Sequence, residues 1–249
     1  MALSSPSSVQ IDVYSANDYS PRGNVTLPLH GPAFFVDMAA CRFYKCLYLA
    51  DAHGKRIVRL KMPVPPNVHK WKVDDIGYGT VISVTSSHDL LVMCDKSNRL
   101  KLFSTDGLQR MRVDLQPDIV SVTSAVELIP GHYLVTHGRG SDVLCRICLV
   151  NNEGKIVHRP IYGGLKRSSH KLMNCPKSVA VDGDGFVYVI EQGTNRLVVL
   201  SSTLEYIRCI KHDLPYGYRR MKMDKALKHV VVVTGNHVTG TQVMLLRLK

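Results

Sequence analysis

Four stretches of the chain repeat one order of apolar and polar positions. Each has an apolar run, a short polar turn, and a second apolar run that begins just after a basic or polar residue. The stretches are Leu47–Leu60, Leu90–Phe103, Tyr133–Arg146 and Val187–Leu200. Short apolar runs separated by turn residues are typical of β-hairpins. The pattern therefore predicts a chain built from tandem pairs of antiparallel strands.

The hairpins recur at nearly regular intervals. Matched apolar positions in their second runs, with a weaker fifth copy near the C-terminus, are Ile57, Leu100, Val143, Leu197 and Val243, which lie 43, 43, 54 and 46 residues apart. This is the period of a propeller blade rather than of a helical repeat. We therefore predict an all-β protein, a β-propeller of four-stranded antiparallel blades. The fold leaves the function open, because propellers share a shape while doing unrelated jobs.

One repeat shows a whole blade. Its inner strand is Pro176–Asp182, a glycine-rich turn follows, and the second strand is Phe186–Ile190. Glycine in such a turn supplies the positive φ angle that a tight hairpin needs. The same pattern predicts further inner strands near residues 33–38, 80–85, 121–128 and 218–224. Five blades are therefore recognisable.

The two ends of the chain look like parts of blades. Val9–Tyr14 resembles a third strand and Asn24–Leu29 a fourth, while Val243–Leu248 at the C-terminus is itself a third strand. We expect one domain over residues 1–249, in which residues 31–249 form the blades and residues 1–30 close the ring. Either the N-terminal strands complete the fifth blade, which removes exposed sheet edges, or a sixth blade is present only as its outer strands.

The segment Leu172–Leu200 closely resembles an NHL repeat. It has the proline, the short apolar strand ending in Val181-Asp182, the glycine turn, the next strand, and Asn195-Arg196 before a further apolar strand. The resemblance implies a propeller that usually has six blades. NHL propellers occur in tripartite-motif ubiquitin ligases, where they recognise substrate protein or RNA. The sequence contains no RING or B-box array and no coiled-coil heptads, so we do not expect it to be a ligase by itself.

The positive charge of the chain is local. The net charge is +12, and residues 158–177 and 206–229 together supply ten of those charges. In a propeller, the turns between second and third strands emerge on the same side as the connections between blades. We expect one basic loop face, whose members are Lys55, Arg56, Lys96, Arg99, Arg139, Lys166, Arg167, His170, Lys171, Arg196, Arg219 and Arg220.

This basic face suggests two kinds of partner. An acidic protein surface would fit it, and so would RNA, because the cations can neutralise phosphates while nearby rings stack on unpaired bases. The rings available for stacking are Tyr162, Tyr216 and Tyr218. We predict a non-catalytic interaction module that binds protein, with single-stranded RNA as the alternative. No DNA or membrane partner is expected, and the isolated chain is expected to be monomeric.

Enzyme chemistry has weaker support. The inner strands carry four acids, Asp37, Glu127, Asp182 and Asp224, which could converge on a metal as in lactonase-type or lyase-type propellers. We instead expect each carboxylate to accept hydrogen bonds from the backbone of its own turn. No Gly-x-Ser-x-Gly elbow and no phosphate-binding loop occurs in the sequence. We predict no cofactor, no bound metal and no catalytic activity.

Cysteine usage and the N-terminus bear on the compartment. Seven cysteines at irregular spacing are typical of reduced thiols rather than of a disulfide framework. Cys41 and Cys46 are the exception, because they occupy facing positions of a predicted hairpin that could be bridged under oxidising conditions. The N-terminus lacks the basic start and apolar run of a signal peptide. We expect a soluble, cytoplasmic protein.

Overall fold

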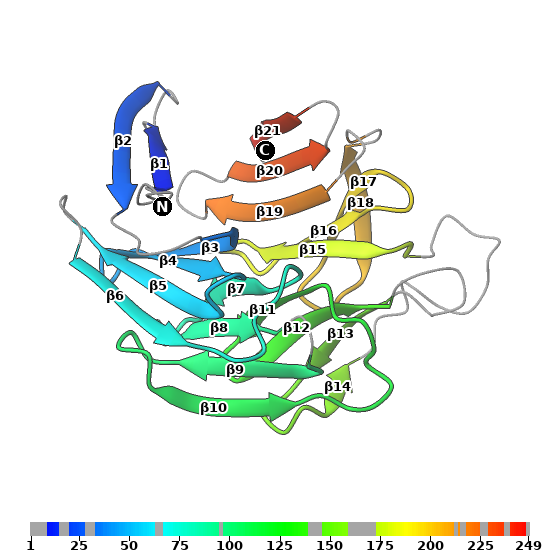
Figure 1. Ribbon diagram of the computed structural model, residues 1–249. Helices are drawn as coiled ribbons and strands as arrows, with labels where there is room; N and C mark the ends of the chain where they lie inside the picture. The colour runs from blue at the N-terminus through cyan, green and yellow to red at the C-terminus, as the bar shows by residue number, and fades with distance from the viewer. Residues whose placement is uncertain are drawn as a thin grey trace.

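The computed structural model is a five-bladed β-propeller (Figure 1). It describes residues 9–14, 20–27, 33–62, 67–94, 97–138, 146–158, 173–211, 214, 218–224, 229–236 and 240–247. These residues form antiparallel strands joined by turns and contain no helix. Accordingly, no helix in the described part of the chain has the length and hydropathy needed to cross a bilayer.

Each blade is an antiparallel sheet whose strands follow one another in sequence from the axis outward. Blade one is β3 (Phe35–Cys41), β4 (Cys46–Asp51), β5 (Arg56–Lys61) and β6 (Asn67–Lys72). Blade two is β7 (Val81–Val84), β8 (Leu90–Met93), β9 (Arg99–Phe103) and β10 (Gln109–Asp114). Blade three is β11 (Ser124–Ile129), β12 (His132–His137), β13 (Arg146–Val150) and β14 (Ile156–His158). Blade four is β15 (Pro176–Val181), β16 (Val187–Glu191), β17 (Arg196–Leu200) and β18 (Tyr206–Lys211). Blade five has three strands among the described residues, β19 (Tyr218–Asp224), β20 (His229–Asn236) and β21 (Gly240–Arg247).

The hydrophobic core lies between neighbouring blades rather than at one centre. An apolar layer joins blades one and two, and similar layers join two to three, three to four and four to five. The second strands lie inside these layers, so every side chain of β8 and β16 is buried. A strand covered on both faces is expected to be apolar at consecutive positions. This explains why apolar and polar residues do not alternate along β8 and β16.

The N-terminal strands close the ring differently from the first sequence alternative. The strands β1 (Val9–Tyr14) and β2 (Pro21–Leu27) pair with each other, and their two-stranded sheet is separate from the sheet of blade five. Val25 and Leu27 pack against Leu49, Val58 and Leu60 of blade one. Figure 1 shows this hairpin standing beside blade one, on the side where blade five lies. The hairpin buries its apolar side chains on blade one and does not extend β21. The ring has five blades, not the six that are usual for NHL propellers.

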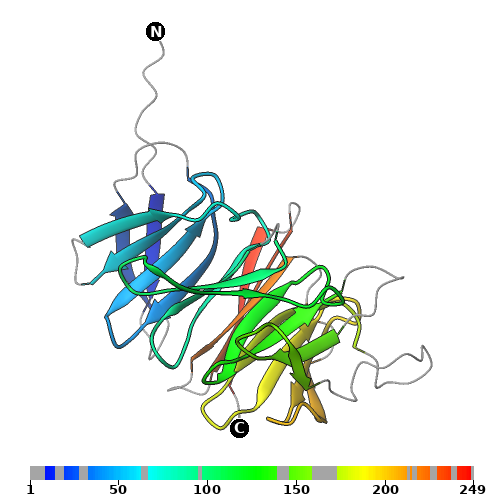
Figure 2. The same ribbon diagram turned by 90° about the horizontal axis from the view of Figure 1, so that it is seen from below.

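The inner strands surround the propeller axis. Successive inner strands β3, β7, β11, β15 and β19 pack side by side, and Figure 2 shows the same ribbon from below. The Nζ atom of Lys222 on β19 lies 2.9 Å from Oδ2 of Asp37 on β3. An ion pair therefore joins the inner strand of the last blade to that of the first.

Candidate functional site

The connections between blades and the turns between second and third strands lie on one face, as the sequence predicted. The amide N–H of Ala52, in the β4–β5 turn, donates to the Phe34 carbonyl at 2.9 Å, and that of Leu115 donates to Asn98 at 3.0 Å. The same kind of contact recurs in blade four at Gln192. We call this side of the propeller the loop face.

Several cations predicted for the loop face are held in ion pairs. Arg56 Nε lies 2.8 Å from Asp51 Oδ2, and Arg196 Nη2 lies 2.6 Å from Glu191 Oε2. Both carboxylates are fully buried. Each pair joins the end of a second strand to the start of a third, so these two guanidinium groups stabilise the turns.

The remaining predicted residues have different surroundings. Arg99 Nε donates to Asp114 at 2.8 Å, and Arg220 Nη2 lies 3.5 and 3.4 Å from the carbonyl oxygens of Gly79 and Thr80. Lys55 is exposed. Outside the described residues lie Lys96, Arg139, Tyr162, Lys166, Arg167, His170, Lys171 and Tyr216, and the side chains of Tyr218 and Arg219 are not described either.

The buried acid that precedes each of these turns was not identified from the sequence. Asp51 and Glu191 each stand five residues before their arginine, and this shared spacing is the signal that could have identified the pairs. Asp51 Oδ1 also accepts from the amide N–H groups of Phe34 at 3.0 Å and Gly54 at 3.1 Å. In blade two, Cys94 occupies the corresponding position, where burial raises the pKa of its thiol to about 11. A neutral thiol cannot pair with an arginine, which is consistent with Arg99 bonding Asp114 instead.

An exposed aromatic cluster stands on the loop face next to blade one. It consists of Phe34, His53 and Tyr78, with Tyr78 5.3 Å from Phe34 and 6.3 Å from His53 between ring centroids. Phe34 is 50% exposed and Tyr78 58% exposed. The three rings come from three separate connections, so no local sequence pattern marked them. We call these residues the aromatic cluster.

The inner-strand acids only partly follow the prediction. Asp182 Oδ1 accepts from the amides of its own turn, including Phe186 N at 2.9 Å, which confirms the expectation for that residue. Glu127 bonds one amide of its own turn and also Ser86 of the neighbouring blade. The prediction is wrong for Asp37, which lies within β3 and accepts from Ile82 N at 2.8 Å. The side chain of Asp224 is not described.

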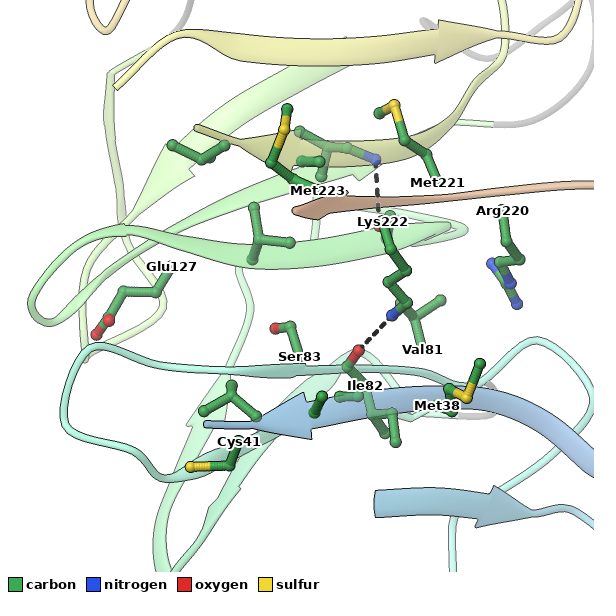
Figure 3. A pocket seen from close by; sticks show the side chains of 18 of the residues that line it. Met38, Cys41, Val81, Ile82, Ser83, Glu127, Arg220, Met221, Lys222 and Met223 are labelled. Carbon is green, nitrogen blue, oxygen red and sulfur yellow. Dashed lines mark hydrogen bonds between the residues drawn. The ribbon is translucent and has the colours of Figure 1, made fainter. Parts of the chain in front are cut away.

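A cavity follows the propeller axis between the inner strands (Figure 3). Its volume is about 550 Å³, and all five inner strands line it. Most of the wall is apolar, and the Lys222 side chain reaches from β19 to the carbonyl oxygen of Ile82 on β7, 2.8 Å from its Nζ atom, as a dashed line in Figure 3 shows. At one end the wall includes Arg42, Phe43 and His88 from turns on the side opposite to the loop face. We call this space the axial cavity.

The structure also shows the surroundings of the potential metal ligands and of the two facing cysteines. Within the described ranges, no three His, Cys, Asp or Glu side chains are grouped so as to hold a metal ion. Cys41 and Cys46 are paired positions of the β3–β4 ladder, as predicted, and both are buried, unbridged thiols. Burial raises the pKa of the Cys46 thiol, which disfavours its reactive thiolate form.

No protein-family model matches the sequence, and no curated protein matches it at a significant level. Several solved structures share its fold. A protein of unknown function from Bacteroides caccae has a TM-score of 0.67 at 11% identity, covering 96% of this chain and 86% of that one. Hydrazine synthase from Kuenenia stuttgartiensis has a TM-score of 0.57 at 11% identity, with coverage of 96% and 89%. Virginiamycin B lyase from Staphylococcus aureus has a TM-score of 0.56 at 11% identity, with coverage of 97% and 75%. At such low identity the likeness extends to the fold alone.

Proposed function

We propose that this propeller is a non-catalytic interaction module that binds another protein through its loop face. The observation that carries the proposal is the aromatic cluster. Phe34 and Tyr78 expose about half of their surfaces on neighbouring connections of the loop face. Large rings presented on a rigid scaffold are the side chains most enriched at protein interfaces and among their energetic hot spots.

The scaffold beneath the cluster supports this proposal. The backbone N–H of Phe34 donates to the buried carboxylate of Asp51, and the backbone N–H of Ala52 donates to the Phe34 carbonyl. Both backbone polar groups of Phe34 are therefore held by hydrogen bonds, which lowers the backbone entropy lost when a partner binds this connection. Lys55 stands exposed in the same β4–β5 turn and adds a positive charge for an acidic partner surface.

The resemblance to NHL propellers indicates the kind of protein that this chain would bind. In tripartite-motif ligases such propellers recognise substrates, so this chain would select a substrate in the cytoplasm while ligase modules reside on another chain. Protein is favoured over RNA because Arg56, Arg99 and Arg196 are bonded to carboxylates. A phosphate contact with any of them would have to compete with an existing ion pair.

A capture experiment with paired variants tests the aromatic cluster. Immobilised wild-type chain is expected to retain a specific protein after nuclease treatment, and Phe34→Ala with Tyr78→Ala is expected to reduce its recovery by about tenfold or more, the loss of roughly one hot-spot interaction. Leu108→Ala is the matched control, because Leu108 is 69% exposed in the β9–β10 turn on the opposite side. Unchanged recovery with the double variant, measured by quantitative mass spectrometry, would contradict the proposal.

RNA is the second candidate, favoured by the net charge of +12 and by the same exposed rings. If RNA is the ligand, the captured protein is released by nuclease. Affinity for a single-stranded homopolymer, measured by fluorescence anisotropy, would then fall by at least about tenfold between roughly 50 and 200 mM salt. A salt-insensitive or undetectable interaction with the homopolymer removes this candidate.

A further inference from the structure

The axial cavity has the dimensions of a small-molecule site. Its volume of about 550 Å³ is within the range of roughly 300–1,000 Å³ that is usual for ligand pockets. The walls include Val81, Val126, Val179 and Val181 from three neighbouring inner strands. Met38 is 51% exposed although it lies on β3, an inner strand, and it lines the cavity (Figure 3). An apolar wall of this kind favours the apolar body of a ligand.

One charged group crosses this apolar space. Lys222 Nζ donates to Asp37 Oδ2 at 2.9 Å and to the Ile82 carbonyl at 2.8 Å. An ammonium group has three donors, and the described residues provide acceptors for these two. The third donor of Lys222 is thus available to an acceptor in the cavity.

The accessible charge in the cavity is positive. The side chain of Lys222 is 39% exposed, whereas that of its counter-ion Asp37 is 4% exposed. A molecule in the cavity therefore meets the ammonium rather than the carboxylate. Arg220 lines the same cavity two residues away on β19 and adds a second cation.

Glu127 also lines the cavity, but its carboxylate does not cancel this positive charge. Both oxygens of Glu127 accept backbone N–H groups, with Ser86 N 2.6 Å from Oε2 and Gly131 N 3.3 Å from Oε1. Arg42 and His88 also line the cavity. Positive groups that line an opening raise the local concentration of anions.

From this arrangement we infer that the axial cavity binds a small organic anion with an apolar body, of the class of medium-chain or aromatic carboxylates. The carboxylate accepts the remaining donor of Lys222, and the apolar body packs against the valine and methionine side chains. A neutral molecule of the same shape forgoes this charge-assisted hydrogen bond. A cation of the same shape is repelled by Lys222 and Arg220.

Calorimetric titration of the full chain with decanoate tests the inference, with decanol and decyltrimethylammonium as neutral and cationic controls. We expect saturable binding of decanoate and at least about tenfold weaker binding of either control, since a charge-assisted hydrogen bond amounts to about that factor. Equal binding of decanol and decanoate would overturn the inference, and so would the absence of decanoate binding.

Two variants test whether decanoate binds in the axial cavity. Lys222→Met removes the ammonium at similar length and is expected to weaken decanoate binding by about tenfold or more. Because this change also leaves Asp37 without its counter-ion, Met38→Trp serves as a second variant that narrows the cavity and keeps both charges. Met38→Trp should weaken decanoate binding comparably. Wild-type affinity in a folded form of either variant would show that decanoate binds elsewhere and would overturn the assignment.

Discussion

Replacing Gly154 with alanine is expected to destabilise the propeller by about 3 kcal/mol or more, the upper part of the range for single substitutions. Gly154 is buried in the turn between β13 and β14 and has a φ angle of +74°. A Cβ atom built there would overlap the backbone carbonyl of Asp114 in blade two. That carbonyl belongs to the end of β10, so relief of the overlap requires a shift of one blade against another.

The measurement is thermal unfolding followed by circular dichroism. For a chain of this size, 1 kcal/mol corresponds to roughly 2–4 °C, so Gly154→Ala should lower the Tm by about 6 °C or more. Gly185→Ala is the matched control, because Gly185 also has a positive φ of +86° but its added Cβ would lie at an ordinary 3.5 Å from Ser202. The control carries only the backbone strain of about 1–2 kcal/mol. Equal losses of Tm for the two variants would contradict the prediction, because the close contact of residue 154 with blade two would then add nothing to the backbone strain.

The blade pattern was predictable from the sequence because it depends on local physics. Second strands such as β16 are buried on both faces and read as continuous apolar runs. Turn residues at regular intervals separate the strands, and the glycine-rich turn of blade four has the predicted positive φ, which falls at Gly185. Repetition of these local signals was sufficient to predict the all-β propeller and the face on which its turns gather.

The ring closure and the candidate site depend on contacts between distant residues. Lys222 and Asp37 are 185 positions apart, so neither local sequence shows that the two charges form an ion pair beside the axial cavity. Asp37 looked like a turn-capping acid because it follows Val36 in the pattern seen at Asp182, but β3 continues to Cys41 and places Asp37 within the strand. The aromatic cluster likewise combines side chains from three connections, and only the assembled loop face brings them together.

Replacing Asp51 with alanine is expected to cost about 3–5 kcal/mol of folding free energy, the usual result of removing one partner from a buried ion pair. The carboxylate is fully buried and bonds Arg56 Nε, Phe34 N and Gly54 N. Its loss leaves the Arg56 guanidinium, whose side chain is only 20% exposed, without its counter-ion. Asp51→Asn keeps an acceptor for the two amides, so its cost should fall below that of alanine.

Urea denaturation followed by fluorescence of Trp71 measures this cost, because the single tryptophan of the chain lies on β6 in the same blade. Asp114→Ala is the control, since Asp114 also pairs with Arg99 but is 56% exposed, and exposed pairs contribute little. The urea midpoint should fall clearly for Asp51→Ala and stay near wild type for Asp114→Ala.

Asp51 also anchors the backbone of Phe34, so a folded Asp51→Asn variant tests whether the carboxylate affects partner binding apart from its effect on folding stability. Full partner capture by that variant would show that the anchoring of Phe34 depends on the hydrogen bonds that asparagine retains, whereas reduced capture would show that the negative charge itself positions the aromatic cluster.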